Sequence, residues 1–433
     1  MRIQRHLPLN VVIVTAAVFA MGLYVKGGAQ AQTAPHYKFD PDWPKPLPNN
    51  WKLGGVIGLG IDQDDNVWVY HRPTDLTSLE LEAELGVSDC CVRPPSMIHI
   101  SKDGSVIGSF DAPQGHGMDV DDSGFAYLGQ DTVRKYDTRT GELVGEIART
   151  PERPGGAPNR PFSIPKRIPG QGGPSPLTRF LQPPHGPAPA QQTAEEAKAM
   201  AAFYAKYPPS TPMIVGTIEE IRVDEAHNEI YVADNYLQGR VLVFDLDTLA
   251  FKRGWGAYAK PLAEISLDPA DHEWVGSTPP KEFQGHLTVN VSRDGLVYAA
   301  DRAADRVHVT TREGEFVEEF LFSPPGTKRG DVGSRGVAGG VTFSADSEQR
   351  YLYVSDMKNN TIWFVDRADG TVLGRYGSMG DNGGQFFGLE LSVTDSRNNI
   401  YTGEVFAGKR VQRLVPADSP RGELLEQLST LQP

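Results

Sequence analysis

Residues 229–244 read EIYVADNYLQGRVLVF, and residues 296–309 read LVYAADRAADRVHV. In both stretches an aromatic residue on an apolar strand is followed three positions later by a polar residue, and a turn then leads into a second strand. This pairing recurs six times, in Trp68 and His71, Tyr127 and Gln130, Tyr231 and Asp234, Tyr298 and Asp301, Tyr353 and Asp356, and Tyr401 and Glu404. Strand units of this size that recur without helices between them are typical of a β-propeller. The sequence therefore predicts an all-β fold, a six-bladed β-propeller.

The composition fits one closed domain. The chain has 433 residues, of which 46 are glycine and 34 proline, as expected where many short strands each need a turn. We therefore expect residues 32–433 to form a single propeller domain. The formal net charge is −13, and a protein this acidic is not expected to bind nucleic acid.

The first 31 residues have the features of a signal peptide. Arg2 and Arg5 precede an apolar stretch from Val11 to Tyr24, and the small-residue sequence AQA follows at 29–31. An uncleaved anchor is the alternative, although a membrane span needs about 20 apolar residues. We expect cleavage and export, which would place a soluble protein in the periplasm or outside the cell.

Two further segments interrupt the repeats. From residue 149 to about 216 the chain is rich in proline, glycine and basic residues, and it contains one helical stretch, TAEEAKAMAAFYAKY, at 193–207. A loop this long inside a closed domain is either functional or disordered. Its helix and its aromatic residues, Phe180 and Phe203 among them, favour a lid over one face of the propeller.

The two cysteines, Cys90 and Cys91, are neighbours in the chain. In an oxidising compartment such a pair closes into a ring or stays as two thiols. Neither form cross-links distant parts of the fold, and two cysteines are too few for a zinc site built from CxxC motifs.

Matching positions in different repeats carry metal-binding residue types. His116, Glu220 and Glu390 each stand eleven residues before the aromatic residue of their unit, and His286 stands one step earlier in the fourth unit. The loops that enter the inner strands of a propeller gather around its central channel, so these side chains are expected to converge. Two histidines and a carboxylate suit a catalytic zinc ion with an open fourth position.

A second interpretation of the same residues is purely structural. Histidines beside a glycine are often hydrogen-bonded turn residues, and strand alternation with Leu287, Val289 and Val291 places His286 on the opposite side of its strand. One extra turn residue in the fourth unit could restore the register.

Arginines and a tyrosine follow the polar residues at the expected rim of the channel. Arg72 and Arg302 each stand directly after the polar residue of their unit, and Tyr236 stands two positions after Asp234. Arginine offers a fixed fork of donors to a carboxylate. A phenol beside a metal or an arginine can lose its proton at a lowered pKa. Salt bridges to neighbouring acids and ordinary packing are the structural alternatives.

These residues occur in stretches that resemble known families. VADNYLQGRVLVF, AADRAADRVHV and VSDMKNNTIWFVD resemble the NHL repeat. The succession of VWVYHRP, HGMDVD, DNYLQGRV and GHLTV resembles the family of peptidyl-α-hydroxyglycine α-amidating lyases. The chain is also similar to uncharacterised exported bacterial six-bladed propellers, which share PDWPKPLPNNW, the paired cysteines and GKRVQRL. The resemblance covers nearly the whole mature chain except 149–216.

The resemblance to the lyases implies roles for particular residues. It implies zinc ligands at His116 and His286, a catalytic base at Tyr236, and arginines for carboxylate and developing charge at Arg72 and Arg302. The family has a third histidine where this sequence has Glu390, and a calcium-binding aspartate where this sequence has Leu391. A zinc site of two histidines and a glutamate is chemically sound, whereas a different metal or none is the alternative.

The leading hypothesis is thus an exported, lyase-like metalloenzyme. Its substrate would be a small carboxylate-bearing hydroxy compound or a peptidyl-α-hydroxyglycine. One alternative is a calcium-dependent hydrolase of the lactonase type, in which Glu220, Asn290 and Glu390 would supply oxygen ligands. The other is a non-catalytic NHL propeller that binds a peptide or protein.

Overall fold

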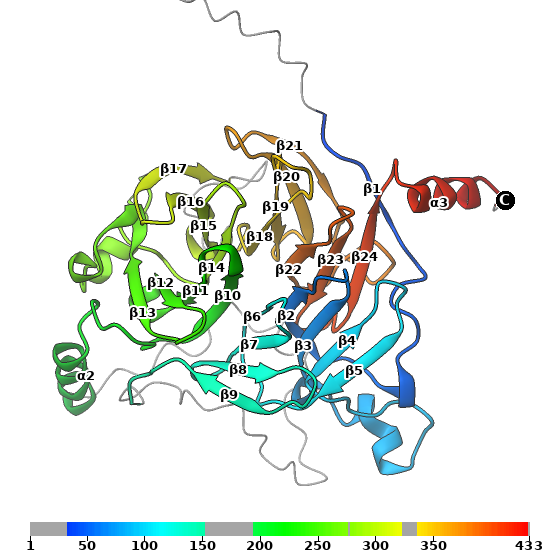
Figure 1. The fold of residues 1–433 in the computed structure, drawn as a ribbon, viewed down its shortest axis with the longest axis horizontal. Coiled ribbons are helices and arrows are strands. Elements are labelled where there is room, and N and C mark those ends of the chain that lie inside the picture. Colours follow the sequence, from blue (N-terminus) through cyan, green and yellow to red (C-terminus); the bar gives the residue numbers. More distant parts are fainter. Residues whose placement is uncertain (1–32, 152–193, 276–277, 323–335, 432–433) are drawn as a thin grey trace, which may run out of the picture. The chain divides into compact units, whose positions relative to one another are not determined.

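The computed structural model describes residues 33–151, 194–275, 278–322 and 336–431. They form six four-stranded antiparallel sheets arranged as the blades of a propeller, so the predicted six-bladed fold is confirmed (Figure 1). The predicted signal peptide at 1–31 and residues 152–193 of the predicted lid lie outside the described residues. Among the described residues, no helix combines the length and apolarity that a membrane span requires.

Each blade is built from four consecutive strands, with one exception at the point of closure. Blades 1 to 3 consist of β2 (Gly55–Ile61), β3 (Val67–Arg72), β4 (Met97–Ile100) and β5 (Val106–Phe110); β6 (Met118–Val120), β7 (Phe125–Gly129), β8 (Val133–Asp137) and β9 (Leu143–Glu146); and β10 (Ile218–Asp224), β11 (Glu229–Asp234), β12 (Arg240–Asp245) and β13 (Phe251–Trp255).

Blades 4 and 5 follow the same plan. They consist of β14 (Leu287–Val291), β15 (Leu296–Asp301), β16 (Arg306–Thr311) and β17 (Phe316–Leu321), and of β18 (Gly340–Phe343), β19 (Tyr351–Asp356), β20 (Thr361–Asp366) and β21 (Val372–Tyr376). Blade 6 consists of β22 (Leu389–Thr394), β23 (Ile400–Glu404), β24 (Val411–Pro416) and the N-terminal strand β1 (Tyr37–Phe39). Helix α2 (Ala194–Lys206) occupies the stretch that the sequence predicts to be helical, and α3 (Pro420–Leu431) follows β24.

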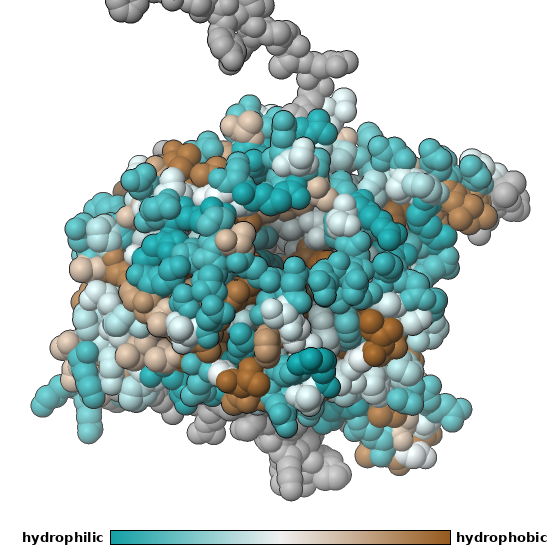
Figure 2. Space-filling view, viewed as in Figure 1, coloured by the Kyte–Doolittle hydropathy of each residue, from teal (hydrophilic) through white to brown (hydrophobic). Residues whose placement is uncertain are grey.

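In Figure 1 the first strand of each blade surrounds the centre, and the fourth lies at the periphery. Apolar side chains fill the space between neighbouring blades. For example, Val309 of blade 4 belongs to the same buried cluster as Val354 of blade 5. Figure 2 shows hydrophilic side chains over most of the viewed face, with the apolar ones in small separate patches.

Five of the six polar residues that predict the blades bond to the loop that enters their own blade, whereas Asp356 bonds to Asn359 and Trp363. Asp301 accepts hydrogen bonds from the backbone N–H groups of Gln284 and Gly285, and it forms a fully buried ion pair with Arg306. His71 bonds to its entry loop through a ring nitrogen: its Nδ1 accepts a hydrogen bond from the backbone N–H of Gly54 (3.1 Å). Buried backbone donors need such partners, which explains why a polar residue recurs at this position.

Closure of the ring brings the two ends of the propeller together. Strand β1 pairs antiparallel with β24, and the fully buried Asp40 follows β1. Asp40 accepts hydrogen bonds from Arg413 on β24 (2.6 Å) and from Arg421 on α3 (2.5 Å). Burial raises the pKa of Asp40, but the hydrogen bonds from Arg421 and Arg413 outweigh it and hold the pKa below its ordinary value of 3.8.

This lowered pKa predicts a pH-dependent contribution to stability. A carboxyl whose folded pKa is depressed stabilises the protein fully above its unfolded pKa, and the contribution is lost as pH falls through the folded pKa. We expect Asp40→Asn to lower the free energy of unfolding by about 2–3 kcal/mol at pH 7, because two arginines lose a charged partner. The difference should shrink toward zero below pH 3.8, as measured by urea unfolding from pH 7 to pH 2.5. A difference that stays constant over this range would contradict the argument.

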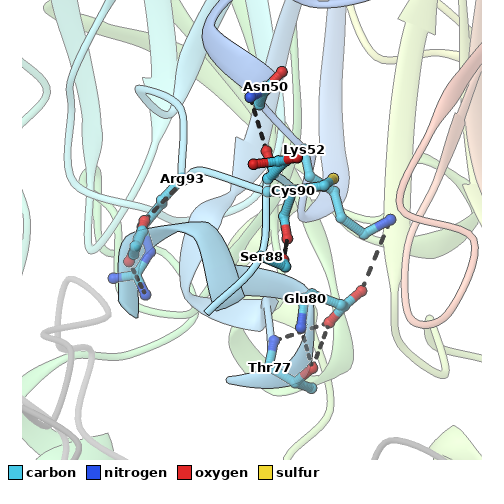
Figure 3. The surroundings of a disulfide bond; sticks show 10 residues. Asn50, Lys52, Thr77, Glu80, Ser88, Cys90 and Arg93 are labelled. Carbon is cyan, nitrogen blue, oxygen red and sulfur yellow. Dashed lines mark hydrogen bonds and ion pairs between the residues drawn. A yellow bond between two sulfur atoms is a disulfide. The ribbon is translucent and has the colours of Figure 1, made fainter. Parts of the chain in front are cut away.

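Cys90 and Cys91 form a disulfide in the insertion between β3 and β4 (Figure 3). The surrounding loop is fastened to the segment before β2, because Asn50 Nδ2 donates to the carbonyl of Asp89 (2.8 Å) and the backbone N–H of Val92 donates to the carbonyl of Asn50 (2.8 Å). The backbone N–H of Lys52 also donates to Val92 (3.1 Å). These hydrogen bonds position the loop without the disulfide.

We therefore expect the cysteine pair to contribute little to global stability. A bond between chain neighbours removes almost no loop entropy from the unfolded state. The variant with Ser at both Cys90 and Cys91 should melt within a few degrees of the parent protein in a calorimetric scan. A loss of more than about 3 kcal/mol would show instead that the pair holds the fold together or links two chains.

Candidate functional site

Two glutamates lie at places where the innermost strands of their blades shift register against the second strands. The pairing of β10 with β11 shifts register between Ile218 and Glu220, and the pairing of β22 with β23 shifts between Leu389 and Leu391. Glu219 and Glu390 are the residues at these shifts. A β-bulge leaves one residue unpaired and redirects its side chain, so these two carboxylates are aimed differently from their neighbours on the same strands.

The two glutamates meet a histidine of blade 2. His116 Nε2 lies 3.6 Å from Glu390 Oε1 and 4.0 Å from Glu219 Oε1. One ligand atom from each of these three residues lies within 4.8 Å of the other two. Both glutamates are buried, and the His116 side chain is 17% exposed. We call this group the His-Glu-Glu cluster.

The backbone of Glu219 fixes the tautomer of His116. His116 Nδ1 lies 2.7 Å from the Glu219 carbonyl oxygen, which can only accept, so Nδ1 carries a proton. Gly117 permits this approach: its φ is +76°, and a Cβ there would lie 2.8 Å from the Glu219 carbonyl oxygen. Nε2 therefore faces two carboxylates with its lone pair unless it is protonated. Either a second proton or a cation must offset the repulsion.

The charges around the cluster keep both carboxylates ionised. Burial raises the pKa of Glu219, but the charges of His116 and Arg302 and the hydrogen bond of His286 outweigh it and hold the pKa well below its usual range. Burial likewise raises the pKa of Glu390, yet Arg302 and His116 bring it below its ordinary value. Burial lowers the pKa of His116, and the two glutamates reverse that effect and raise it.

His286 contacts the cluster through Glu219. Its Nδ1 lies 3.0 Å from Glu219 Oε1, and its side chain is 59% exposed. The backbone of His286 is left-handed, with φ of 53°, a conformation that is uncommon outside glycine and is often held at functional sites. On the other side, Asn235 Nδ2 donates to Glu219 Oε2 (3.0 Å), and Asn235 Oδ1 accepts from the backbone N–H of Leu287 (3.1 Å).

Both predicted arginines lie at the cluster. Arg302 Nη1 donates to Glu390 Oε1 at 2.6 Å, and Nη2 lies 3.6 Å from Glu219 Oε1. Arg72 Nε and Nη2 each lie 3.3 Å from the carbonyl oxygen of Gly115, the residue before His116. Arg302 thus bridges the two carboxylates, whereas Arg72 holds the loop that presents the histidine.

Tyr236 lies in an aromatic cluster with helix α2. Its side chain is fully buried and packs with Phe203, Tyr204 and Tyr207. Its hydroxyl donates to the Tyr207 carbonyl oxygen at 2.5 Å. The phenol therefore fastens the end of the α2 segment to the rim of blade 3.

The structure thus separates the predicted site residues into three groups. Glu390 contacts both His116 and Arg302. His286 contacts Glu219, and Arg72 contacts the loop that carries His116. Tyr236 packs against helix α2. The catalytic and ligand roles of these residues stay predictions.

Glu219 and Asn235 are the site residues that sequence reasoning missed. Glu220, which the repeat alignment selected, is buried beside Glu219 and is paired with Arg222 (3.0 Å) instead. Burial raises the pKa of Glu220 to about 7, with Arg222 opposing the shift. A signal for Asn235 was present, because it follows the polar residue of its unit as Arg72 and Arg302 follow theirs.

Two of the three oxygen ligands suggested for a calcium site, Glu220 and Asn290, have partners outside the cluster. Asn290 Nδ2 donates to the carbonyl of Val341 (2.8 Å), and its Oδ1 accepts from the backbone N–H of Val291 (2.8 Å). Of the three residues proposed for calcium, Glu390 is the one that belongs to the His-Glu-Glu cluster.

Comparison with known proteins adds only a distant likeness. No protein-family model matches the sequence, and no curated protein matches it. Among solved structures, a structural genomics protein of unknown function from Bacteroides thetaiotaomicron VPI-5482 is similar, with 16% sequence identity over 84% of this chain and 70% of that chain and a TM-score of 0.46.

Proposed function

We propose that this protein is an exported, metal-dependent lyase that acts on a carboxylate-bearing hydroxy compound of the peptidyl-α-hydroxyglycine type. The observation that carries the proposal is the His-Glu-Glu cluster, with His116 Nε2 turned toward two ionised carboxylates. The resemblance of the strand-turn-strand units to NHL repeats and of the rim residues to the amidating lyases supports it. The predicted signal peptide supports export.

The donor set fits a zinc ion. One imidazole nitrogen and two carboxylate oxygens are ligands that Zn²⁺ accepts in catalytic sites with an open position. Hydrogen bonds from an outer shell orient such ligands, and here the Glu219 carbonyl orients His116 while Asn235 and His286 hold Glu219. A zinc ion at this site would act as a Lewis acid on the substrate hydroxyl.

The charge of the surroundings favours an anionic substrate. Two carboxylates balance a divalent cation, which leaves Arg72 and Arg302 as positive side chains beside the cluster. A guanidinium group binds a carboxylate in a fixed geometry, and this interaction becomes stronger as water is excluded. The arginines would therefore hold the substrate carboxylate and orient the hydroxyl toward the cluster.

In the proposed reaction a proton moves and a C–N bond breaks. Tyr236 would accept the proton of the substrate hydroxyl as a phenolate, after loss of the proton that its hydroxyl donates to the Tyr207 carbonyl in the structure. The carbon that bore the hydroxyl becomes an aldehyde as its bond to nitrogen breaks, and the proton is returned to that nitrogen. The products are an amide and glyoxylate, so atoms and charge balance without an oxidant.

Metal analysis and turnover together test the proposal. Purified mature protein should hold close to one equivalent of zinc and convert α-hydroxyhippurate to benzamide and glyoxylate. Dialysis against a chelator should abolish both, and added Zn²⁺ should restore both. Restoration by Ca²⁺ alone would favour the lactonase-type alternative. Absence of both metal and turnover would favour a binding propeller.

A further inference from the structure

In each of the six blades, one residue directly follows the polar residue at the end of the second strand. These residues are Arg72, Asp131, Asn235, Arg302, Met357 and Val405. The residues of blades 1, 3 and 4 bond to the His-Glu-Glu cluster or to the loop that carries it. The residues of blades 5 and 6 are apolar. The residue at this position is therefore polar in blades 1 to 4 and apolar in blades 5 and 6.

Met357 marks the boundary between the polar and the apolar residues. Its Sδ lies 4.0 Å from Nη1 of Arg302, the same nitrogen that donates to Glu390. The half-buried Met357 side chain packs against the buried cluster that includes Ile57 and Val405. A flexible thioether at this place is suited to contact apolar groups of varied shape.

Phe406 adds an apolar side chain from blade 6. Its side chain is 44% exposed, and its backbone is left-handed with φ of 56°. Its ring lies close to Gly388, where a Cβ would come within 3.2 Å of Phe406 Cδ2. Gly388 stands two residues before Glu390, and its carbonyl accepts from the backbone N–H of Val405 (2.8 Å). Residues in sparsely populated backbone regions cluster at functional sites, and Phe406 lies against Gly388, two residues before Glu390.

We propose that Met357 and Phe406 form an apolar wall beside the Arg302 and Glu390 pair, and that the substrate carries an apolar group beyond its hydroxyl-bearing carbon. This inference rests on the proposed function, because it takes the arginines as the carboxylate-binding groups. Charge recognition by Arg302 and apolar contact with Met357 adjoin each other, so one small molecule can satisfy both. A purely polar hydroxy acid would leave the wall in contact with water.

A pair of matched ligands tests this inference. Glycolate and mandelate are both hydroxyacetates, and they differ by one phenyl group. Calorimetric titration of the zinc-loaded protein should show that mandelate binds at least about tenfold more tightly, since burial of an aromatic ring contributes this much or more. Met357→Gln and Phe406→Ser should each lower that ratio toward one while leaving the affinity for glycolate within about twofold.

Two control variants separate the wall from general effects. Met357→Leu keeps an apolar side chain of similar size, and Phe316→Ser removes a ring that is 40% exposed on the outer strand β17. Both should keep the preference for mandelate. Equal binding of the two ligands by the parent protein, or a preference that survives in both Met357→Gln and Phe406→Ser, would overturn the wall and leave the proposed function standing. No binding of glycolate by zinc-loaded protein would overturn the carboxylate site and the wall together.

Discussion

Glu219→Ala should bind zinc about 100–700-fold more weakly than the parent protein, whereas His286→Ala should bind it only about 10–100-fold more weakly. Four ligands of a structural zinc site together contribute about 10–16 kcal/mol, so one ligand contributes about 2.5–4 kcal/mol. Glu219 belongs to the His-Glu-Glu cluster, and His286 reaches it through Glu219 Oε1. Loss of a group that orients a ligand has the smaller effect.

Competition with a chromophoric chelator measures these affinities directly. Glu220→Gln is the matched control, because Glu220 is the buried neighbour of Glu219 but pairs with Arg222. Its zinc affinity should stay within about tenfold of the parent value. The reverse order, with His286→Ala losing the metal and Glu219→Ala keeping it, would restore the ligand set His116, His286 and Glu390 that the sequence predicts.

The contrast between Glu219 and Glu220 shows what a repeat alignment can and cannot predict. The blades could be predicted because an aromatic residue and a polar residue recur at fixed spacing, and most of these polar residues bond to backbone groups of the loop that enters their blade, as Asp301 does. This bonding follows from the repeat itself. It does not depend on contacts between distant parts of the chain.

Which side chains of an inner strand point toward the channel depends on contacts between distant parts of the chain. Strict alternation assigns Glu219 and Glu220 to opposite sides of β10, but the register shift at Ile218 to Glu220 decides which of them reaches His116. A single bulge residue reverses the assignment. The sequence pattern contains no mark of the bulge, so spacing alone selected Glu220. The same shift in β22 happened to fall on Glu390, where the alignment had already placed a ligand.

Asn235 was missed for a different reason. An amide after the polar residue of a blade is compatible with many turn structures, and its two partners, Glu219 and Leu287, come from different blades. An arginine at the same position, such as Arg302, suggests a carboxylate partner by its charge. Charge made the arginines predictable, and the neutral amide needed the structure.

Tyr236→Phe should lower turnover of α-hydroxyhippurate by about 100-fold or more while leaving zinc content unchanged, if Tyr236 takes the substrate proton. A positioned acid or base commonly contributes a factor of this size. The structure supplies a competing role, because the hydroxyl donates to the Tyr207 carbonyl at the end of the α2 segment. Loss of that hydrogen bond alone should cost about 1 kcal/mol of stability.

The two roles differ in what they do to turnover and to stability. Tyr204→Phe is the control, since Tyr204 lies in the same aromatic cluster with its ring 6.0 Å from that of Tyr236. It should leave turnover near the parent value. A Tyr236→Phe protein that is destabilised by about 1 kcal/mol but turns over at the parent rate would show that the phenol serves only to hold α2. A 100-fold loss with an unchanged melting temperature would show that the phenol acts on the substrate and that its hydrogen bond to the Tyr207 carbonyl contributes little to stability.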